Sequence, residues 1–410
     1  MIQIEIKDNK KVEFALEELK KTVHDNVFHH SLCSNILLFN VDIKGIKKIR
    51  ERLNLLLVSI SRFQKYTSHS IEDFKRAILE EIEARKGIKP EVFRFIFYLN
   101  IERSSIEKKR FFALRGSKLF SRTHSFIDRN FNLEKFIAES RLYVNVKIPP
   151  SPAMFQPFEC IVSGRNDGEA FWKAFDIFEL FRAILNFSNN FGVISVHFGS
   201  RHAYLNSFLP SPFCLVYNSK REYLHFRYDL IEYKYKTFNR TGAFFKPEVF
   251  RLLLKVFRDE IKEESIEVII LEALFHYVKA LDSLEWETDF LKLWRILEVI
   301  TFYSEESTIK LTGNRIKLLF HQTPKWNYVI DFLCSLRNEL VHKGNFPEEG
   351  SDQVSALKFI VENAISILIS MRKDFKDKAA LRLFYENDSS GTGDLRKKIS
   401  VIKKILAYRK

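Results

Sequence analysis

Three side chains in one short stretch of the chain could act together on a phosphodiester. Arg337, Asn338 and His342 lie within the segment "RNELVH". The guanidinium of Arg337 can hold a phosphate through two parallel hydrogen bonds, and the amide of Asn338 can orient an imidazole or a ribose hydroxyl. His342 can exchange a proton near neutral pH, so it could remove the proton of a 2′-hydroxyl or protonate the leaving oxygen. These groups would need no metal and no cofactor, and DNA, which lacks the hydroxyl, could not react in this way.

A helix with a defined end is needed to present these groups. Apolar residues recur at steps of three and four between residues 330 and 341, which predicts an amphipathic helix. Gly344 can adopt a left-handed conformation and Pro347 cannot continue a helix, so we expect the helix to end near Lys343. The last turn of a helix favours a positively charged side chain, and His342 would occupy that turn.

The three groups would not all face the same way. Asn338 and His342 are four residues apart and share a face of the helix. Arg337 and His342 are five residues apart, which separates them by about 140° around the axis. They could still serve one pocket if the helix frays at its end, or if a second copy of the chain completes the site.

The motif and the segments around it resemble the HEPN superfamily of ribonucleases, in particular its Apea-like branch. "RNELVH" is similar to the signature of that family, an arginine usually followed by a polar residue, with a histidine a short spacer later. Phe290–Glu306 resembles the first, long apolar helix of the family, Leu311–Phe320 the second, the motif segment the third and Val354–Met371 the fourth. The likeness covers residues 266–372.

The resemblance implies a homodimer in which two motif helices meet, so that both copies contribute Arg337 and His342 to one cleft. It implies a metal-independent endoribonuclease that is often toxic to its host during phage infection, with a trigger that the sequence does not name. In one branch a tyrosine two residues after the histidine receives a nucleotide, and Gly344 at that position argues against this branch. Some members are inert scaffolds, in which case Arg337 would pair with Glu339 or a neighbouring helix and His342 would cap its own carbonyls.

Glu298 is the carboxylate that we expect to support the site. It follows Trp294 and Leu297 on an apolar helix, so it needs a charged partner if it is buried. Arg337 or Arg315 could supply that partner, and holding Arg337 would be a positioning role. The alternative is a partly exposed glutamate.

Composition describes an ordinary globular protein with an excess of positive charge. The 410 residues suffice for two or three domains, and 46% are hydrophobic and 29% charged. Gly (13) and Pro (10) are scarce while Phe is abundant (40), which favours long helices. The formal charge of +14 points to a polyanionic partner, and RNA fits better than an acidic small molecule. The alternative is that the charge only keeps the protein soluble.

The cysteines and the apolar runs bear on the compartment. Cys33, Cys160, Cys214 and Cys334 are far apart and form no CxxC pair, so they indicate neither a disulfide framework nor a zinc site. The first residues alternate between apolar and polar, and no apolar run reaches the length of a membrane span, about 18 residues. We therefore expect a cytoplasmic protein without integral membrane association.

We expect an α+β protein that is mainly α, in four parts. Residues 1–138 would form a mixed domain, residues 139–245 a strand-containing middle domain, residues 246–375 the HEPN-like helical bundle, and residues 376–410 would contain a hinge at Asn387–Gly393 and a basic amphipathic tail. The patterns predict helices at Val12–His24, Gly45–Tyr66 and Ser70–Lys86, the last with a capping box of Ser70 and Asp73. They predict strands at Ile2–Ile6, Asn35–Ile43, Arg141–Pro149, Phe158–Gly164, Gly192–Gly199, Phe213–Asn218 and Glu222–Tyr228, while Val92–Ile101 fits a strand or a buried helix.

The segment 103–122 is the best candidate surface for an RNA backbone. It holds seven Lys or Arg residues against one acid, Glu107. Three phenylalanines interleave with this charge and could stack on bases, or they could turn into the core and leave a solvated basic face. The candidate RNA-binding residues are Lys108, Lys109, Arg110, Arg115 and Lys118.

Two further features complete the pattern. In the middle domain a helix capped by Asp167 carries a stripe that we interpret as core: Phe171, Phe175, Phe178, Phe181 and Ile184. We interpret His197, His202, His225 and His276 as structural, because no carboxylate or cysteine joins them at metal-ligand spacing. The tail 395–410 holds seven Lys or Arg and no acid, with Leu395, Ile399, Ile402 and Leu406 on one helical face. Such a helix could contact RNA, an anionic membrane surface or its own domain.

The prediction from sequence is a toxic endoribonuclease that acts in anti-phage defence on single-stranded or loop RNA, with tRNA as one candidate. The alternatives are a non-catalytic RNA-binding or adaptor protein on the same scaffold, and a regulator at the membrane surface that uses the basic tail.

Overall fold

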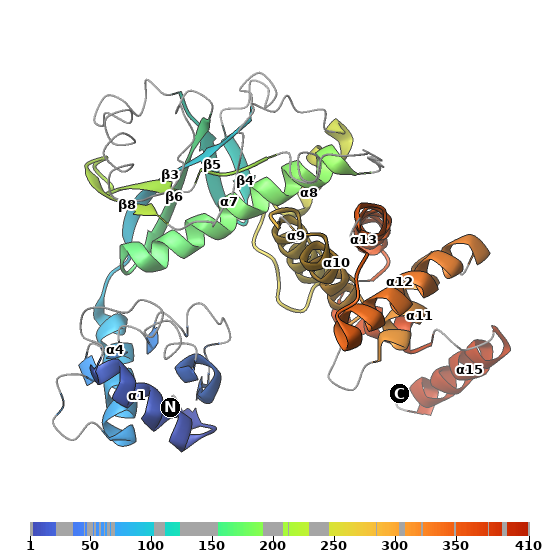
Figure 1. Ribbon diagram of the computed structural model, residues 1–410, viewed down its shortest axis with the longest axis horizontal. Coiled ribbons are helices and arrows are strands. Elements are labelled where there is room, and N and C mark those ends of the chain that lie inside the picture. Colours follow the sequence, from blue (N-terminus) through green and yellow to red (C-terminus); the bar gives the residue numbers. More distant parts are fainter. Residues whose placement is uncertain are drawn as a thin grey trace. The chain divides into compact units, whose positions relative to one another are not determined.

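The chain is an α+β protein that is mainly helical, as expected (Figure 1). The computed structural model describes residues 3–21, 36–44, 46, 52, 55–56, 59–60, 62–63, 66, 70–101, 111–123, 155–191, 208–211, 213–228, 246–283, 285–302, 308–320, 323–347, 350–375, 377–387 and 392–408. They fall into two compact units. One comprises residues 1–94, 162–174 and 217–221, and the other residues 95–161, 175–216 and 222–410.

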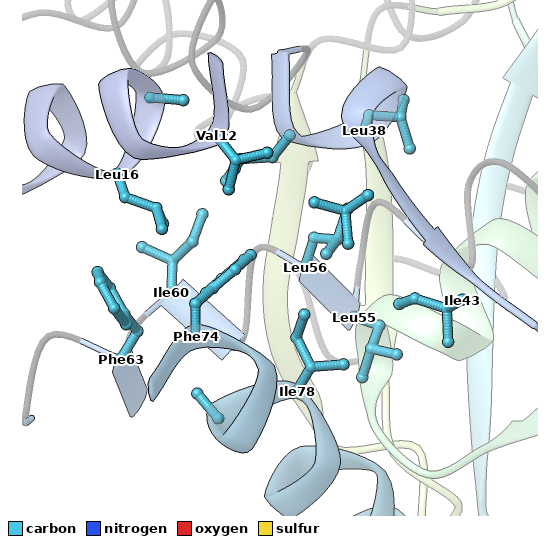
Figure 2. Packing of buried hydrophobic residues seen from close by; sticks show 14 of the residues in the cluster. Val12, Leu16, Leu38, Ile43, Leu55, Leu56, Ile60, Phe63, Phe74 and Ile78 are labelled. Atoms are coloured by element: carbon cyan, nitrogen blue, oxygen red, sulfur yellow. The ribbon is translucent and has the colours of Figure 1, made fainter. Parts of the chain in front are cut away.

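The first unit is built around a small apolar core. Helices α1 (Asn9–Lys21) and α4 (Ile71–Gly87) accompany the antiparallel strands β1 (Ile4–Ile6) and β2 (Val41–Ile43). Figure 2 shows side chains from these elements, among them Val12, Ile43 and Phe74, packed together with residues of the segment between β2 and α4.

The local predictions for the first unit are largely confirmed. The side chain of Ser70 accepts a hydrogen bond from the Asp73 N–H at 3.1 Å and the Asp73 carboxylate accepts one from the Ser70 N–H at 3.3 Å, so the capping box is present. The predicted strand Asn35–Ile43 is wrong in its first part, because residues 36–40 are helical. Much of Gly45–Tyr66 lies outside the described residues.

A six-stranded sheet forms the centre of the second unit. Residues 91–94, 162–164 and 217, at the ends of three of its strands, are assigned to the first unit. Its order is β4 (Phe111–Leu114), β5 (Ser117–Ser121), β6 (Gln156–Gly164), β3 (Glu91–Leu99), β7 (Phe213–Tyr217) and β8 (Tyr223–Tyr228). The strands predicted at 158–164, 213–218 and 222–228 are confirmed, and the ambiguous segment 92–101 is a strand. Residues 141–149 and 192–199 lie outside the described part of the chain. Because β3–β5 precede residue 138 and β6–β8 follow it, the domain boundary expected there falls within one sheet.

Helix α7 (Asp167–Asn190) packs against this sheet through aromatic side chains. Phe178 stacks on Phe97 of β3 with ring centroids 4.6 Å apart, and Phe181 lies 4.6 Å from Phe112 of β4. The whole predicted stripe from Phe171 to Ile184 is buried, so its interpretation as core is confirmed. The cap differs by one residue, because it is the side chain of Asn166 that accepts the Glu169 N–H, at 2.8 Å.

The helical part of the second unit follows the sheet in sequence. It comprises α8 (Pro247–Val256), α9 (Ile266–Leu281), α10 (Trp286–Ile300), α11 (Ile309–Leu319), α12 (Pro324–Lys343) and α13 (Ser351–Met371). Helix α10 packs most extensively on α9 and α13, and α11 packs on α12 (Figure 1). The segments expected to be helical from 246 to 375 each contain a helix, but α10 begins before the expected Phe290 and ends at Ile300, short of the expected Glu306.

Buried ionic contacts join these elements. Arg182 of α7 is completely buried, and its guanidinium donates to Glu179 at 2.7 Å and to Asp282, which caps α9, at 2.6 Å. In the bundle, Lys358 and Glu362 of α13 form a buried ion pair at 2.7 Å, and the Tyr277 hydroxyl donates to the same carboxylate. Removing one partner of such a buried contact leaves a charge without compensation, so these contacts restrict how the helices can pack.

Two C-terminal helices follow the bundle. Helix α14 (Lys378–Glu386), which the sequence did not predict, is docked through the buried side chains of Leu381 and Tyr385. The predicted amphipathic tail is the helix α15 (Thr392–Tyr408). Most of the expected hinge, residues 388–391, lies outside the described residues.

One helix among the described residues, α13, is long and apolar enough to cross a membrane by those criteria alone. Its apolar side chains, including Val354, Leu357 and Val361, are buried in the bundle, as is the Lys358–Glu362 pair. The composition of α13 therefore matches that of a core helix.

Candidate functional site

The helix that carries the motif ends where the sequence predicted. The last helical residue of α12 is Lys343, and Gly344 follows with φ of 67°, donating its N–H to the carbonyl of Leu340 at 3.0 Å. This left-handed cap strongly favours glycine, because a side chain would be strained at that φ. The position of His342, in the last turn, is therefore set by local sequence.

Arg337 is directed toward the neighbouring helix α10. Its Nη2 atom lies 3.6 Å from Oε1 of Glu298, and its side chain is 18% exposed. Its Nε atom is buried and has no hydrogen-bond partner among the described residues. The guanidinium therefore reaches Glu298 at ion-pair distance and keeps one donor unused beneath the surface.

Of the two alternatives for Glu298, burial with a charged partner or partial exposure, the structure shows burial. The carboxylate has two cationic partners. Arg295, one turn earlier on α10, donates to Oε2 at 3.0 Å, and Arg337 faces Oε1. Arg315, the other candidate partner, donates instead to the carbonyl of Thr301 at 2.6 Å. Arg295 was not predicted as a partner, although its spacing of three residues from Glu298 on one helix favours such a pair.

Asn338 and His342 lie on the exposed side of α12. The exposed pair Glu339–Lys343, 3.7 Å apart, accounts for Glu339. Arg337 pairs instead with a neighbouring helix through Glu298, which is the other arrangement expected of an inert member. Two large aromatic side chains, Tyr328 at 78% and Phe332 at 54%, are also exposed on this helix. The outer side of α12 thus offers polar, acid–base and aromatic groups to a partner.

Within one chain, the groups of the motif are divided between two sides of the helix. Arg337 faces α10, whereas Asn338 and His342 are exposed, in keeping with a separation of about 140° around the axis and about 7.5 Å along it. Any site that uses Arg337 and His342 together therefore needs either a change at the end of α12 or groups from a second copy.

Only residues 111–122 of the basic segment 103–122 belong to the described part of the chain. Lys108, Lys109 and Arg110 lie outside the described residues, while Arg115 and Lys118 belong to the hairpin of β4 and β5. Arg115 and Gly116 form its two-residue turn with φ of 48° and 71°, which is the geometry of a tight hairpin turn. Their N–H groups donate to the carbonyls of Phe257 and Arg258 at 2.7 and 3.0 Å, so the turn is docked on the end of α8.

The phenylalanines of this hairpin divide between core and surface. Phe112 is buried, whereas Phe111 is 44% exposed and its ring lies 5.9 Å from that of Phe120. Lys118 lies over the Phe111 ring at 5.3 Å. Arg122 lies over the Phe120 ring at 4.6 Å and donates to Glu159 at 2.6 Å. One side of the hairpin therefore shows cations paired with aromatic rings, and the other packs inward.

The remaining candidates lie apart from the motif. His225 contacts the carbonyl of Phe226 at 3.2 Å, and burial lowers the pKa of His276 to about 4, so His276 is neutral at physiological pH. His197 and His202 lie outside the described residues. Cys160, Cys214 and Cys334 are free thiols, and among the residues that the structure describes no group of three or more His, Cys, Asp or Glu is placed to hold a metal ion.

Comparison with known proteins adds no relative. No family model, curated protein or solved structure matches the chain.

Proposed function

We propose that this chain is a metal-independent endoribonuclease of the HEPN type whose active site is completed by a second copy of the chain. The observation that carries the proposal is the combination at the end of α12. Arg337 is positioned by the buried carboxylate of Glu298, and the exposed Asn338 and His342 follow it on a helix with a glycine cap.

The chemistry needs only these groups. His342 takes the proton of a 2′-hydroxyl, the freed oxygen attacks the adjacent phosphorus, and the bond from phosphorus to the 5′-oxygen breaks. A proton returns to the leaving oxygen, so the products are a 2′,3′-cyclic phosphate and a 5′-hydroxyl. Arg337 offsets the charge that develops on the phosphoryl oxygens, and Asn338 orients the imidazole or the ribose.

Arg337 lies on one side of α12, and Asn338 and His342 lie on the other. This separation supports the proposal that a second copy of the chain completes the site. In the dimer that the family resemblance implies, two α12 helices meet and His342 of one copy lies beside Arg337 of the other. Exposed Tyr328 and Phe332 on the same helix provide apolar area for such a contact. The proposed setting, defence against phage with tRNA or other loop RNA as the target, rests on the family resemblance.

The activity is tested with tRNA and purified protein in EDTA. We expect fragments that end in 2′,3′-cyclic phosphate, and we expect Arg337→Ala and His342→Ala each to remove the activity. Lys343→Ala is the matched control, because Lys343 is an exposed cation beside the motif that pairs only with the exposed Glu339 in the described contacts. Light scattering shows whether the variants keep the oligomeric state of the parent. Full cleavage by either motif variant would contradict the proposal.

Mixing the two inactive variants tests the second copy directly. If each site takes Arg337 from one chain and His342 from the other, a mixed dimer contains one intact site and regains activity. If both groups come from the same chain, no combination is intact and the mixture stays inactive. This experiment needs subunit exchange, which a brief incubation with dilute denaturant before mixing can provide.

A second candidate function is a non-catalytic RNA-binding or adaptor protein. The cation and ring pairs of the β4–β5 hairpin favour it, because such pairs can hold a single strand without cutting it. RNA that binds and remains intact, together with expression toxicity that does not depend on His342, would favour this function over the endoribonuclease.

A further inference from the structure

The C-terminal helix α15 exposes an apolar stripe. Leu395, Ile399 and Ile402 fall on one side of the helix, and Ile399 and Ile402 are 52% and 55% exposed. The preceding helix α14 behaves differently, since its Leu381 and Tyr385 are almost fully buried. Docking on the rest of the chain therefore buries Leu381 and Tyr385 of α14, although Leu383 of that helix is exposed, and it leaves Ile399 and Ile402 of α15 open.

Cations cover the opposite side of α15. Arg396, Lys397, Lys403 and Lys404 are exposed, and Asp394 in the first turn is the only acid of the helix. With 100° between successive residues, these four lie about 80° to 200° around the axis from Leu395. Lys398 is nearer to the apolar side, where its Nζ atom contacts Oδ1 of Asn387 at 2.7 Å and ties α15 to the end of α14. The helix thus carries an apolar face and a strongly basic face.

The chemical character of the apolar face indicates whether α15 binds RNA or an anionic membrane surface. Proteins that hold single-stranded RNA use aromatic side chains on which bases stack, but the exposed stripe of α15 is aliphatic. Aliphatic side chains with lysines around them suit the boundary between headgroups and acyl chains, where the apolar face enters the lipid and the cations meet anionic headgroups. We propose that α15 binds the surface of a membrane rich in anionic phospholipids, lying in the plane of the interface with Ile399 and Ile402 inserted.

The proposal explains both faces with one partner. The charge is complementary to anionic headgroups, and the two isoleucines gain free energy only in an apolar phase. It does not depend on the ribonuclease activity, because α15 lies outside the motif helix. The association is peripheral, since a helix with five cations in 17 residues cannot span the acyl region.

The test uses the full-length chain and sedimentation with vesicles. Vesicles of phosphatidylcholine alone are compared with vesicles that also contain phosphatidylglycerol. We expect the anionic vesicles to bind at least about tenfold more tightly, with binding that weakens as salt rises. Equal binding to both, or binding to neither, would overturn the proposal.

Two matched variants separate insertion from charge. Ile399→Asp and Ser400→Asp each add one negative charge to exposed positions of the same helix, but only the first interrupts the apolar stripe. We expect Ile399→Asp to bind anionic vesicles at least about tenfold more weakly than Ser400→Asp, because it also loses the burial of an isoleucine. Both should unfold at the same denaturant concentration as the parent, since neither side chain is in the core.

Other partners give other outcomes. If the two variants weaken vesicle binding equally, the stripe does not insert and the proposal fails. If the chain ignores vesicles but binds an RNA oligonucleotide, and both variants weaken that binding alike, α15 is a nucleic-acid surface. If Ile399→Asp alone lowers the molecular mass in solution, the stripe is covered by a second copy.

Discussion

Oε1 of Glu298 on α10 lies 3.6 Å from Nη2 of Arg337 on α12, and this pair connects the proposed catalytic helix to the core of the bundle. The carboxylate is buried and the guanidinium is 18% exposed, so the contact is partly shielded from water. A charge held in this way has fewer side-chain conformations and a more defined position than a free arginine. Glu298 is thus a positioning residue in the proposed enzyme.

Replacing Glu298 by Gln should weaken cleavage more than it weakens the fold. Glutamine keeps the shape and one acceptor but removes the charge that faces Arg337. We expect the rate of tRNA cleavage to fall about tenfold, and the free energy of unfolding to fall by about 1–2 kcal/mol. Cleavage kinetics and urea unfolding of the same protein measure both, and RNA affinity should change little.

Arg295→Ala is the control for Glu298→Gln. It removes the other cationic partner of Glu298, but Arg295 is 53% exposed and does not belong to the motif. Its loss should cost at most about 1 kcal/mol of stability and leave cleavage nearly unchanged. Normal cleavage by Glu298→Gln would show that Arg337 does not need its carboxylate.

Helices α11 and α12 approach closely at Gly313, and the contact makes a second prediction. A Cβ atom at this position would lie 2.7 Å from Sγ of Cys334 on α12, which is shorter than two such atoms tolerate. Gly313→Ala should therefore lower the free energy of unfolding by about 1–3 kcal/mol, although alanine is otherwise the better helix former.

A second substitution can relieve this clash. Cys334→Ala removes the sulfur, so the double variant Gly313→Ala/Cys334→Ala should recover most of the stability in urea unfolding. Gly393→Ala is the control, since no atom lies within 4 Å of its added Cβ, and it should cost nothing. If the double variant were as unstable as Gly313→Ala alone, the loss would have to come from a source other than contact with the sulfur.

Short-range chemistry was the most predictable part of this protein. The capping box of Ser70 and Asp73, the end of α12 at Gly344 and the buried stripe of α7 depend on neighbouring residues or on helical period. Each of these is set within a few residues, so the sequence determines it without knowledge of distant contacts.

Contacts between residues far apart in the sequence could not be predicted from local patterns. The sheet joins strands on both sides of residue 138, and α14 docks in a segment for which no helix was expected. The choice between Arg315 and Arg337 as the partner of Glu298 also depended on how three helices pack. Strand order and interhelical contacts follow from total burial across the chain, which a local pattern does not contain.

The third prediction concerns Asp289, a buried carboxyl group in the first turn of α10. Burial raises the pKa of this group from 3.8 to about 7, although the neighbouring Ser283 and Lys292 act in the opposite direction. At pH values between 3.8 and about 7, Asp289 holds a proton in the folded chain that it has released in the unfolded chain. Stability contributed by this proton is therefore present below about pH 4, falls as pH rises through the window and is lost above about pH 7.

Asp289→Asn should remove this dependence, because the amide resembles the protonated acid at every pH. We expect the variant to match the parent near pH 4 and to exceed its free energy of unfolding by about 2–4 kcal/mol at pH 8.

His276, with its pKa lowered to about 4, makes stability rise with pH between about pH 4 and 6.5, which is the opposite sign. Because it is present in both proteins, its effect cancels in the difference. Glu287→Gln, an exposed acid in the same turn, is the control and should leave the pH profile unchanged. Urea unfolding at several pH values measures the difference, and a constant difference across the range would show that the pKa of Asp289 is the same in the folded and the unfolded chain.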